Sequence, residues 1–287
     1  MTKTSHHMIY RFITAVALGL TVSALTSCAK SVAETASDTF VFADNSDDLK
    51  CITREYKNLK NFDEVSLSTG VDVTYQVGSP AKAVVTVSEN VADLLVVEVN
   101  GGELRMGIEN KFGKSLRRFK VKAVVTGPAL TSVKVSSGAD FNLAEGEKMG
   151  VSDGNLSLSA SSGGDIKMNG LLKYNKISTS ASSGADINIS AVKVGSLSAS
   201  ASSGADINIS GIDAESVSAS SSSGADIRLS GTTREVSLSA SSGADISARK
   251  LIAGTGRANA SSSGDISCSI KNPTSLHHSS GGGVSNH

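Results

Sequence analysis

The sequence is poor in aromatic side chains: of its 287 residues, seven are Phe, four are Tyr and none is Trp. Proline is also scarce, with three residues, whereas glycine reaches 28. Large rings supply much of the buried area of an ordinary globular core. Their scarcity indicates a narrow core filled by small aliphatic side chains, as in a repetitive fold.

Histidine is absent from residues 8–276, because all five imidazoles lie at the two ends of the chain. Imidazole is a frequent general base and a frequent metal ligand. The sequence therefore disfavours most hydrolases and zinc sites. The 27 basic residues balance the 27 acidic ones, so no excess of positive charge favours a nucleic acid as a partner.

The N-terminus has the pattern of a secretory signal. Lys3 and Arg11 precede an apolar run from Phe12 to Leu25, which at about 14 residues is too short for a permanent transmembrane helix. The run ends in Leu25-Thr26-Ser27-Cys28, which resembles the bacterial lipobox, whose Cys is acylated and becomes the first residue of the mature chain. We predict a signal peptide over residues 1–27 and a lipidated Cys28 that anchors the protein to the membrane.

The residues after Cys28 bear on localisation. Ala29 follows the Cys, and in the enterobacterial sorting rule a residue other than Asp at this position implies passage to the outer membrane. The acidic cluster that marks some lipoproteins for surface export is absent from residues 29–34. We therefore expect an outer-membrane lipoprotein whose face, periplasmic or external, stays open. Residues 28–50 are rich in Ala, Ser, Thr and Asp, which predicts a flexible tether.

From residue 138 onward the chain repeats the phrase Gly-Ala-Asp-Ile, with small variations, in seven copies. Successive Asp residues are separated by 25, 21, 20, 20, 19 and 20 residues. A near-constant period of this length is typical of a solenoid in which each repeat packs on its neighbours. The turn glycines are Gly138, Gly163, Gly184, Gly204, Gly224, Gly243 and Gly264, and the aspartates are Asp140, Asp165, Asp186, Asp206, Asp226, Asp245 and Asp265.

Within one period, apolar and polar residues alternate over residues 197–202 and again over 205–210. Alternation with a period of two predicts β-strands. The sequence therefore predicts an all-β fold, a right-handed parallel β-helix with about 20 residues per coil and roughly ten coils. We expect one such domain over residues 51–271, with irregular coils over 51–135 and regular Ser-Gly-Ala-Asp repeats over 136–271. Residues 272–287 would form a tail that is either disordered or caps the last coil.

Two cysteines other than Cys28 remain, Cys51 and Cys268. An oxidising envelope would permit them to pair, but they lie near opposite ends of the predicted solenoid. Residues whose α-carbons are more than about 7 Å apart cannot form a disulfide. We predict two separate thiols.

Several short motifs together resemble one known family. They are Asn61-Phe62-Asp63-Glu64-Val65, Gly70-Val71-Asp72-Val73, Gly102-Glu103-Leu104-Arg105-Met106 and the run from Gly127 to Val133 that leads into the repeats. Residues 58–270 resemble the Bacteroidota family described as putative auto-transporter adhesin, head GIN domain. The resemblance implies a right-handed β-helix in the cell envelope and an adhesive role. It brings no catalytic residues.

Stacked coils would place the seven aspartates in one column at a spacing of about 4.8 Å, where like charges repel. In one interpretation each carboxylate caps a turn by accepting backbone N–H bonds, and Lys167 and Arg228 neutralise part of the charge. In the other the column is a weak calcium site, because the phrase resembles half of the calcium-binding nonapeptide. A single column offers fewer oxygen ligands than calcium requires, so we predict a structural ladder with no metal and no cofactor.

Three further patterns bear on function. The aspartates are spread evenly, so no pair stands out as an acid and a base, which disfavours an enzyme. Residues 191–250 contain 18 Ser, whose hydroxyl ladders would suit ordered water or a glycan, although aromatic rings for stacking on sugars are few. Basic residues cluster over Lys111–Lys122, as in a segment that meets a polyanion or in a solvated hairpin.

The sequence thus predicts a lipid-anchored envelope adhesin or binding module without catalytic activity. Its expected partners are the membrane, reached through the lipid anchor, and a glycan or an envelope protein, and no nucleic acid. The alternative is a periplasm-facing structural scaffold. A calcium-dependent adhesin and a polysaccharide-active enzyme are less favoured.

Overall fold

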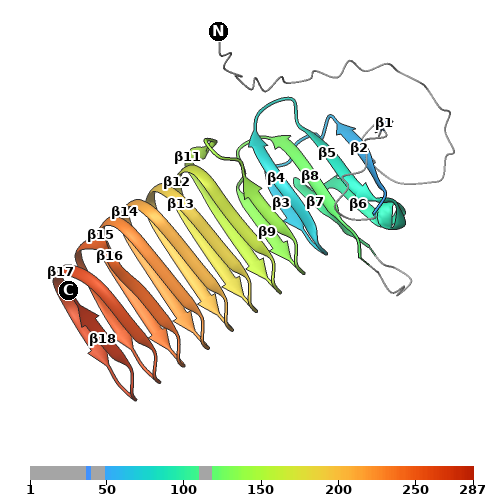
Figure 1. The fold of residues 1–287 in the computed structure, drawn as a ribbon. Coiled ribbons are helices and arrows are strands. Elements are labelled where there is room, and N and C mark those ends of the chain that lie inside the picture. The colour runs from blue at the N-terminus through green and yellow to red at the C-terminus, as the bar shows by residue number, and fades with distance from the viewer. Residues whose placement is uncertain (1–36, 40–48, 110–117) are drawn as a thin grey trace, which may run out of the picture. The chain divides into compact units, whose positions relative to one another are not determined.

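The structure, a computed structural model, describes residues 37–39, 49–109 and 118–287. These residues belong to one compact unit, Ala33–His287, and most of them form β-strands (Figure 1). The predicted signal peptide, the predicted lipidation site Cys28 and the basic residues 111–117 lie outside the described residues.

The repeats form a parallel β-solenoid of about seven turns with roughly 20 residues per coil, which confirms the predicted fold class. Each regular coil is one long bent strand that begins at the repeat Asp and ends just before the next Ser-Gly pair (Figure 1). Neighbouring coils pair in parallel and in register, so that Asp186 lies beside Asp206 and Ile187 beside Ile207. These strands are β12 (Asp165–Ser182), β13 (Asp186–Ser202), β14 (Asp206–Ser222), β15 (Asp226–Ser241), β16 (Asp245–Ala260) and β17 (Asp265–His278).

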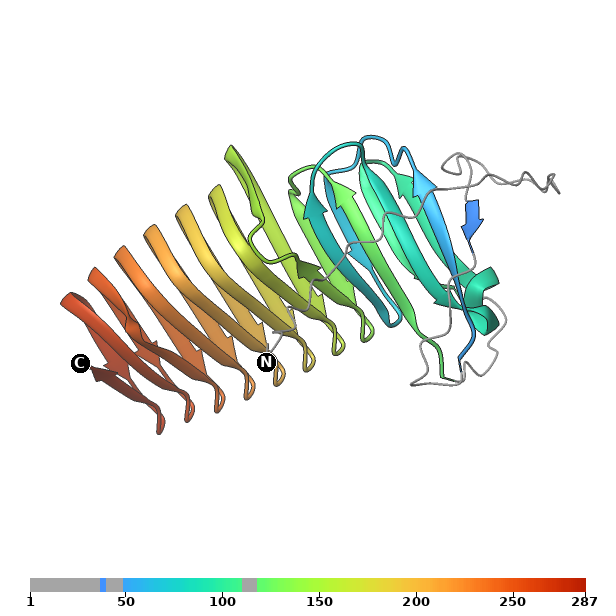
Figure 2. The same ribbon diagram turned by 45° about the horizontal axis from the view of Figure 1, so that its top comes forward.

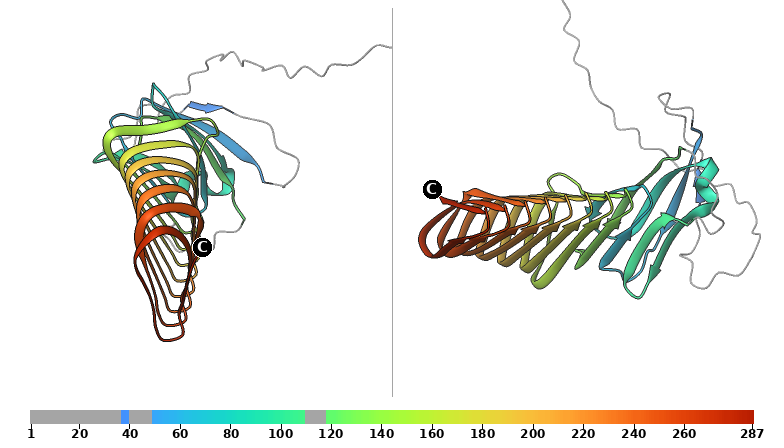
Figure 3. Two further views of the ribbon diagram at one scale, coloured as in Figure 1. Left: turned by 90° about the vertical axis from the view of Figure 1, so that its left-hand side faces the viewer. Right: turned by 90° about the horizontal axis from the view of Figure 1, so that it is seen from below.

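Each coil is a flattened loop with two different edges (Figures 2 and 3). At the sharp edge the chain reverses through the Ser-Gly pair. At the opposite, rounded edge the strand bends without ending, at Ser190-Ala191 in β13 and at Ser210-Gly211 in β14. The rounded edge is where the register shifts between neighbouring coils, for example between Ile209 and Ile212.

The interior between the two faces of a coil is filled by aliphatic side chains, as the shortage of aromatics predicts. Ile187, Ile207 and Ile227 are fully buried, and Leu197 and Val217 are buried from the other face. The repeat alanines fill the narrow space beside the sharp edge, where a larger group would overpack the core. The hydrophobic stack is therefore continuous from coil to coil.

Larger rings occur where the regular coils give way to the N-terminal strands. Tyr75 and Phe141 stack with ring centroids 5.6 Å apart, and both are fully buried. Tyr174 is also buried, and its hydroxyl donates to the carbonyl oxygen of Leu130 at 2.6 Å. The N-terminal end of the core is thus wide enough for aromatic residues.

The N-terminal region mixes parallel and antiparallel pairing. β3 and β4 continue the parallel stack against β9 and β10, whereas β2 with β5, β5 with β8, and β6 with β7 are antiparallel. The prediction of irregular coils over residues 51–135, and of roughly ten coils in all, is therefore wrong for the antiparallel strands. These strands are β2 (Cys51–Lys57), β3 (Glu64–Leu67), β4 (Val71–Val77), β5 (Lys82–Ser88), β6 (Leu95–Asn100), β7 (Glu103–Ile108), β8 (Val121–Gly127), β9 (Ser132–Ser136), β10 (Asp140–Leu143) and β11 (Lys148–Ser161), with a short 3-10 helix, η1 (Glu89–Leu94), after β5.

Both predicted boundaries of the domain shift. Within the predicted tether, residues 28–50, β1 (Ser37–Thr39) pairs antiparallel with β2. At the other end β17 continues to His278, and β18 (Gly283–Asn286) pairs in parallel with Asp265–Cys268. The predicted tail, residues 272–287, therefore belongs to the solenoid and covers part of its last coil. Cys51 and Cys268 are free thiols, as predicted.

Candidate functional site

The sharp edge is built from a two-residue turn that recurs in every coil. Ser203 and Gly204 have φ angles of 55° and 69°, and two successive positive φ values are the mark of a type I′ turn. In the next coil the turn is closed by a main-chain hydrogen bond from Ala225 N to Ser222 O at 3.3 Å. The turn also pairs with its neighbour, because Gly204 N donates to Ser223 O at 3.2 Å.

Six of the seven predicted turn glycines have this geometry, and the seventh does not. In the shortened last copy Ser262 and Ser263 take the positive φ angles, 49° and 62°. Gly264 instead occupies the place that Ala244 has in the preceding coil, so its prediction as a turn glycine is wrong. A β-carbon on Gly264 would lie 2.7 Å from Ser241 N, which explains why no larger residue stands there. The six turn glycines, with φ between 68° and 70°, are Gly138, Gly163, Gly184, Gly204, Gly224 and Gly243.

The repeat aspartates form one continuous column along the solenoid, next to the sharp edge. The column is longer than the seven repeats, because Asp72 of β4 lies in register with Asp140. The phrase Gly70-Val71-Asp72-Val73 is the sequence signal for this extra member. Lys122 stands beside Asp72 at one end, and Gly283 stands beside Asp265 at the other. The seven predicted members are Asp140, Asp165, Asp186, Asp206, Asp226, Asp245 and Asp265.

Partial burial opposes ionisation of three aspartates of the column, and repulsion by neighbouring aspartates adds to this effect at two of them. Desolvation, followed by the charges of Asp72 and Asp165, raises the pKa of Asp140 above its ordinary value. Desolvation and the charges of Asp165 and Asp206 likewise raise the pKa of Asp186. Burial also raises the pKa of Asp72, with Lys122 acting in the opposite direction. The ionised forms of these three carboxylates therefore cost the folded state some stability.

Two basic side chains offset part of this charge, as predicted. Arg228 places Nη2 2.9 Å from Asp226 Oδ2 and Nη1 3.9 Å from Asp206 Oδ2, so it bridges two coils. Lys167 Nζ lies 3.9 Å from Asp165 Oδ2. Among the described residues, no three His, Cys, Asp or Glu side chains are grouped so as to hold a metal ion. The geometric reason is that a single file of carboxylates does not surround a cation.

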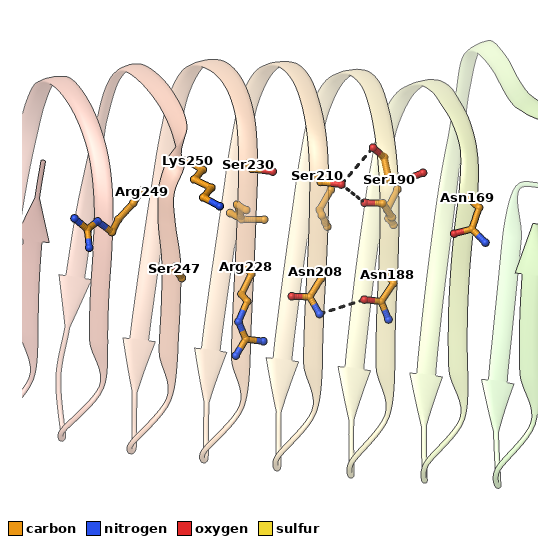
Figure 4. A pocket seen from close by; sticks show the side chains of 13 residues that line it. Asn169, Asn188, Ser190, Asn208, Ser210, Arg228, Ser230, Ser247, Arg249 and Lys250 are labelled. Carbon is orange, nitrogen blue, oxygen red and sulfur yellow. Dashed lines mark hydrogen bonds between the residues drawn. The ribbon is translucent and has the colours of Figure 1, made fainter. Parts of the chain in front are cut away.

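A groove of about 620 Å³ runs across five coils, between the aspartate column and the rounded edge (Figure 4). Two rows of polar side chains line it, with Ile189, Ile209 and Leu229 between them. One row lies two residues beyond the aspartates, and its members are Asn188, Asn208, Arg228 and Ser247; the other lies at the bend of the rounded edge, and its members are Asn169, Ser190, Ser210, Ser230, Arg249 and Lys250. In the part of the chain that the structure describes, no Asp or Glu lines this groove.

Hydrogen bonds between coils hold the side chains of the groove in place. Asn208 Nδ2 donates to Asn188 Oδ1 at 3.2 Å, which joins the two amides into a short ladder (Figure 4). Ser210 Oγ donates to the carbonyl oxygens of Ile189 and Ser190, both at 3.3 Å. Each amide keeps a further donor or acceptor, and each hydroxyl keeps acceptor positions. The groove therefore offers a ligand a fixed array of polar groups.

Small residues at the bend let neighbouring coils approach each other closely beside the groove. A β-carbon on Gly231 would collide with the main chain of Ile212 in the preceding coil, and one on Gly211 would lie 2.8 Å from Ser190 O. The neighbouring coils therefore leave no room for a larger side chain at these two positions of the bend. β16 departs from the pattern, because Arg249-Lys250 replaces the Ser-Gly or Ser-Ala pair.

The sequence pattern pointed to the aspartate column and not to this groove. Asn188 and Asn208 occupy outward positions of the alternating pattern, and the sequence predicts Arg228 only as a partner of the aspartates. The signal that could have identified the groove is the identical Asp-Ile-Asn-Ile-Ser phrase at residues 186–190 and 206–210. That phrase places an amide and a hydroxyl at the same height in two successive coils.

Comparison with known proteins gives the family of the chain. The family described as putative auto-transporter adhesin, head GIN domain, matches residues 61–210 and 180–287. No curated protein matches the chain. Among the described residues, no helix is long and apolar enough to cross a membrane.

Solved structures share the fold at low sequence identity. A putative adhesin from Parabacteroides distasonis is 18% identical, with a TM-score of 0.72, and the match covers 84% of this chain and 98% of that one. A putative adhesin from Bacteroides fragilis is 20% identical, with a TM-score of 0.61 and coverage of 83% and 97%. A structure described as a putative lipid binding protein from Parabacteroides distasonis is 19% identical, with a TM-score of 0.60 and coverage of 83% and 96%. Because the family match spans most of the sequence and the fold agrees, this chain belongs to the family described as putative auto-transporter adhesin, head GIN domain.

Proposed function

We propose that this chain is a lipid-anchored adhesin of the outer membrane that binds its ligand, without catalysis, in the groove beside the rounded edge. The observation that carries the proposal is the pair of polar rows repeated from coil to coil, of which the Asn188–Asn208 amide ladder is the most regular part. Rows that repeat at about 4.8 Å along the solenoid suit an extended ligand with its own repeat.

The chemistry of the groove supports binding rather than catalysis. Its lining supplies amides, hydroxyls and basic groups. General acid–base catalysis draws mostly on imidazole or carboxylate groups within reach of the substrate, and the lining residues provide neither. The family description and the solved relatives described as adhesins support the same conclusion.

The N-terminal sequence supports the lipid anchor. The run Leu25-Thr26-Ser27-Cys28 stands where the apolar signal segment ends, and acyl chains on Cys28 would anchor the protein without a spanning helix. Labelling cells with a clickable fatty acid tests this directly. We expect the label on the wild-type protein, and we expect the Cys28→Ser variant to lose both the label and the membrane association. A labelled Cys28→Ser variant would refute the anchor.

Attachment of cells tests the binding role. The variant Asn188→Ala/Asn208→Ala removes the amide ladder and leaves the buried Ile positions unchanged. We expect cells that display it to attach less to a surface colonised by the wild type than cells with the wild type do. Ser198→Ala/Ser218→Ala, on the opposite face of the same two coils, is the matched control. Equal attachment by all three strains would refute a binding role for the groove.

Protease treatment of intact cells separates the adhesin from the alternative, a periplasm-facing scaffold. We expect cleavage in intact cells, with a periplasmic protein left uncut as the internal control. If the protein is cleaved only after the outer membrane has been permeabilised, the adhesin proposal is refuted and the periplasm-facing scaffold is supported.

A further inference from the structure

The two ends of the groove differ in charge. Asn188 and Asn208 line the end nearer the N-terminal coils, whereas Arg228, Arg249 and Lys250 line the end nearer the C-terminal coils (Figure 4). In the described part of the chain the lining contains these basic residues and no acidic ones. The formal net charge of the whole chain is zero, so this local excess of positive charge is a feature of the groove.

A local irregularity of β16 places two of these basic residues. Arg228 pairs with Ser247, but Ser230 pairs with Lys250, so β16 carries one more residue than β15 over this stretch. A β-bulge of this kind bends the strand and changes the direction of its side chains. On the other side of β16 the register shifts again, between Ala248 and Ile252. The bend of β16 is therefore enlarged on both sides at the residues that replace the small pair.

Arg249 and Lys250 carry charge that the protein does not neutralise. The guanidinium of Arg228 lies 2.9 Å from the carboxylate of Asp226 and 3.9 Å from that of Asp206. These two carboxylates neutralise much of its charge. Arg249 and Lys250 are exposed and, among the described residues, pair with no carboxylate. An anion entering the groove is repelled by the aspartate column on one side and attracted by these two residues on the other.

We propose that the groove binds an acidic polysaccharide that lies along the solenoid, with carboxylates on Arg249 and Lys250 and hydroxyls on the Asn and Ser rows. A polymeric ligand explains why the polar rows repeat in successive coils. Its acidic groups explain the two uncompensated basic residues at one end of the groove. Among the described residues no aromatic ring lines the groove, so recognition relies on hydrogen bonds and charge rather than on ring stacking. This inference rests on the proposed binding function.

Calorimetric titration of the purified protein with polygalacturonate, in buffer with chelator, tests the inference. Fully methyl-esterified polygalacturonate is the matched ligand, because it keeps the sugar chain and removes the negative charge. We expect the acid to bind, its affinity to fall as salt rises, and the ester to bind at least tenfold more weakly.

Two double variants locate the site. Arg249→Gln/Lys250→Gln removes the two uncompensated charges, and we expect it to weaken binding of the acid at least tenfold. Lys173→Gln/Arg234→Gln removes one Lys and one Arg from a separate surface hollow, and we expect wild-type affinity. Equal losses in both variants would overturn the assignment to the groove. Equal melting temperatures of the two variants would show that loss of folding does not explain a difference between them.

The remaining outcomes separate this inference from the proposed function. If the ester binds as tightly as the acid, the acidic ligand is refuted while a glycan-binding groove stands. If neither polymer binds but Asn188→Ala/Asn208→Ala still reduces cell attachment, the acidic polysaccharide is likewise refuted and the adhesin stands. If duplex DNA competes as well as polygalacturonate, the groove is a general polyanion site and the assignment to a glycan is overturned.

Discussion

The side-chain amide of Asn286 pairs with the main chain of Ile270 as a further β-strand would. Ile270 N donates to Asn286 Oδ1 at 2.7 Å, and Asn286 Nδ2 donates to Ile270 O at 3.0 Å. Ile270 lies just beyond the segment of β17 that β18 covers in parallel. One amide group thus extends the cover of the last coil by a residue. An uncovered strand edge is a template for pairing with another chain, so this contact protects the end of the solenoid.

Replacing Asn286 by Ala should destabilise the last coil by about 1 kcal/mol, which is the usual net contribution of such hydrogen bonds to stability. It should also increase self-association, because the edge at Ile270 is then open. Thermal denaturation and light scattering measure the two effects. Asn286→Asp is the informative companion: it keeps the acceptor for Ile270 N and loses the donor to Ile270 O, so we expect an intermediate effect. An unchanged melting temperature and an unchanged scattering mass for the Ala variant would contradict the role.

Replacing Asp186 by Asn should stabilise the protein at neutral pH by up to about 1 kcal/mol, the range of partly exposed charge interactions. The physical reason is that burial and the charges of Asp165 and Asp206 penalise its ionised form. Chemical denaturation at pH 7 measures the change. Asp245→Asn, at an exposed member of the same column, is the control and should gain less. A destabilised Asp186→Asn variant would instead support the predicted turn cap.

The same carboxylate gives a definite sign to the pH dependence of stability. Its pKa is raised in the folded state, so between the unfolded value of about 3.9 and the folded value the native protein binds more protons than the unfolded chain. Its contribution to stability therefore falls as pH rises through that window. We expect the stability difference between Asp186→Asn and wild type to be small below pH 4 and to grow as the pH rises above that value. A difference that stays constant over this range would rule out the raised pKa.

The glycines of the two edges should respond differently to substitution by Ala. Gly204 has a positive φ of 69° but open space around its missing β-carbon, so the cost should be about 1–2 kcal/mol of left-handed strain. A β-carbon on Gly231 would meet the main chain of Ile212, which cannot move without disturbing the neighbouring coil. We therefore expect Gly231→Ala to lower the melting temperature more than Gly204→Ala. The reverse order would contradict the close approach of the coils at the rounded edge.

Calcium should leave the melting temperature of the protein unchanged. A ligand that binds only the folded state at 100 times its dissociation constant stabilises it by about 2.7 kcal/mol, which would appear as a shift of several degrees. The single file of aspartates does not provide the six to eight oxygens that calcium prefers. Melts with millimolar calcium and with excess chelator should therefore coincide. A higher melting temperature in calcium would show that the column binds the metal and would support the calcium-dependent adhesin.

The sequence by itself determined the strands, the period and the core of the repeats. Alternation with a period of two places the side chain of Ile187 in the core and that of Asn188 on the surface. The period of about 20 residues determines which residues of successive coils stack on one another. These features depend on local pattern, and every coil repeats the same pattern. The sequence also suffices to predict Asp72 as an extra member of the column, because the phrase Gly70-Val71-Asp72-Val73 resembles the repeat phrase.

Only the tertiary structure decided the pairing of the N-terminal strands and the position of the groove. Alternation is the same in a parallel and in an antiparallel strand, so the β2–β5 pair could not be distinguished from a coil by its pattern. The groove depends on the pairing of successive coils, which brings Asn188 beside Asn208, and on the register shift in β16 where Arg249 and Lys250 lie. These features are relations between coils rather than properties of one strand. The local pattern determines which face of the strand a side chain occupies, whereas packing against the next coil determines which residues lie next to it.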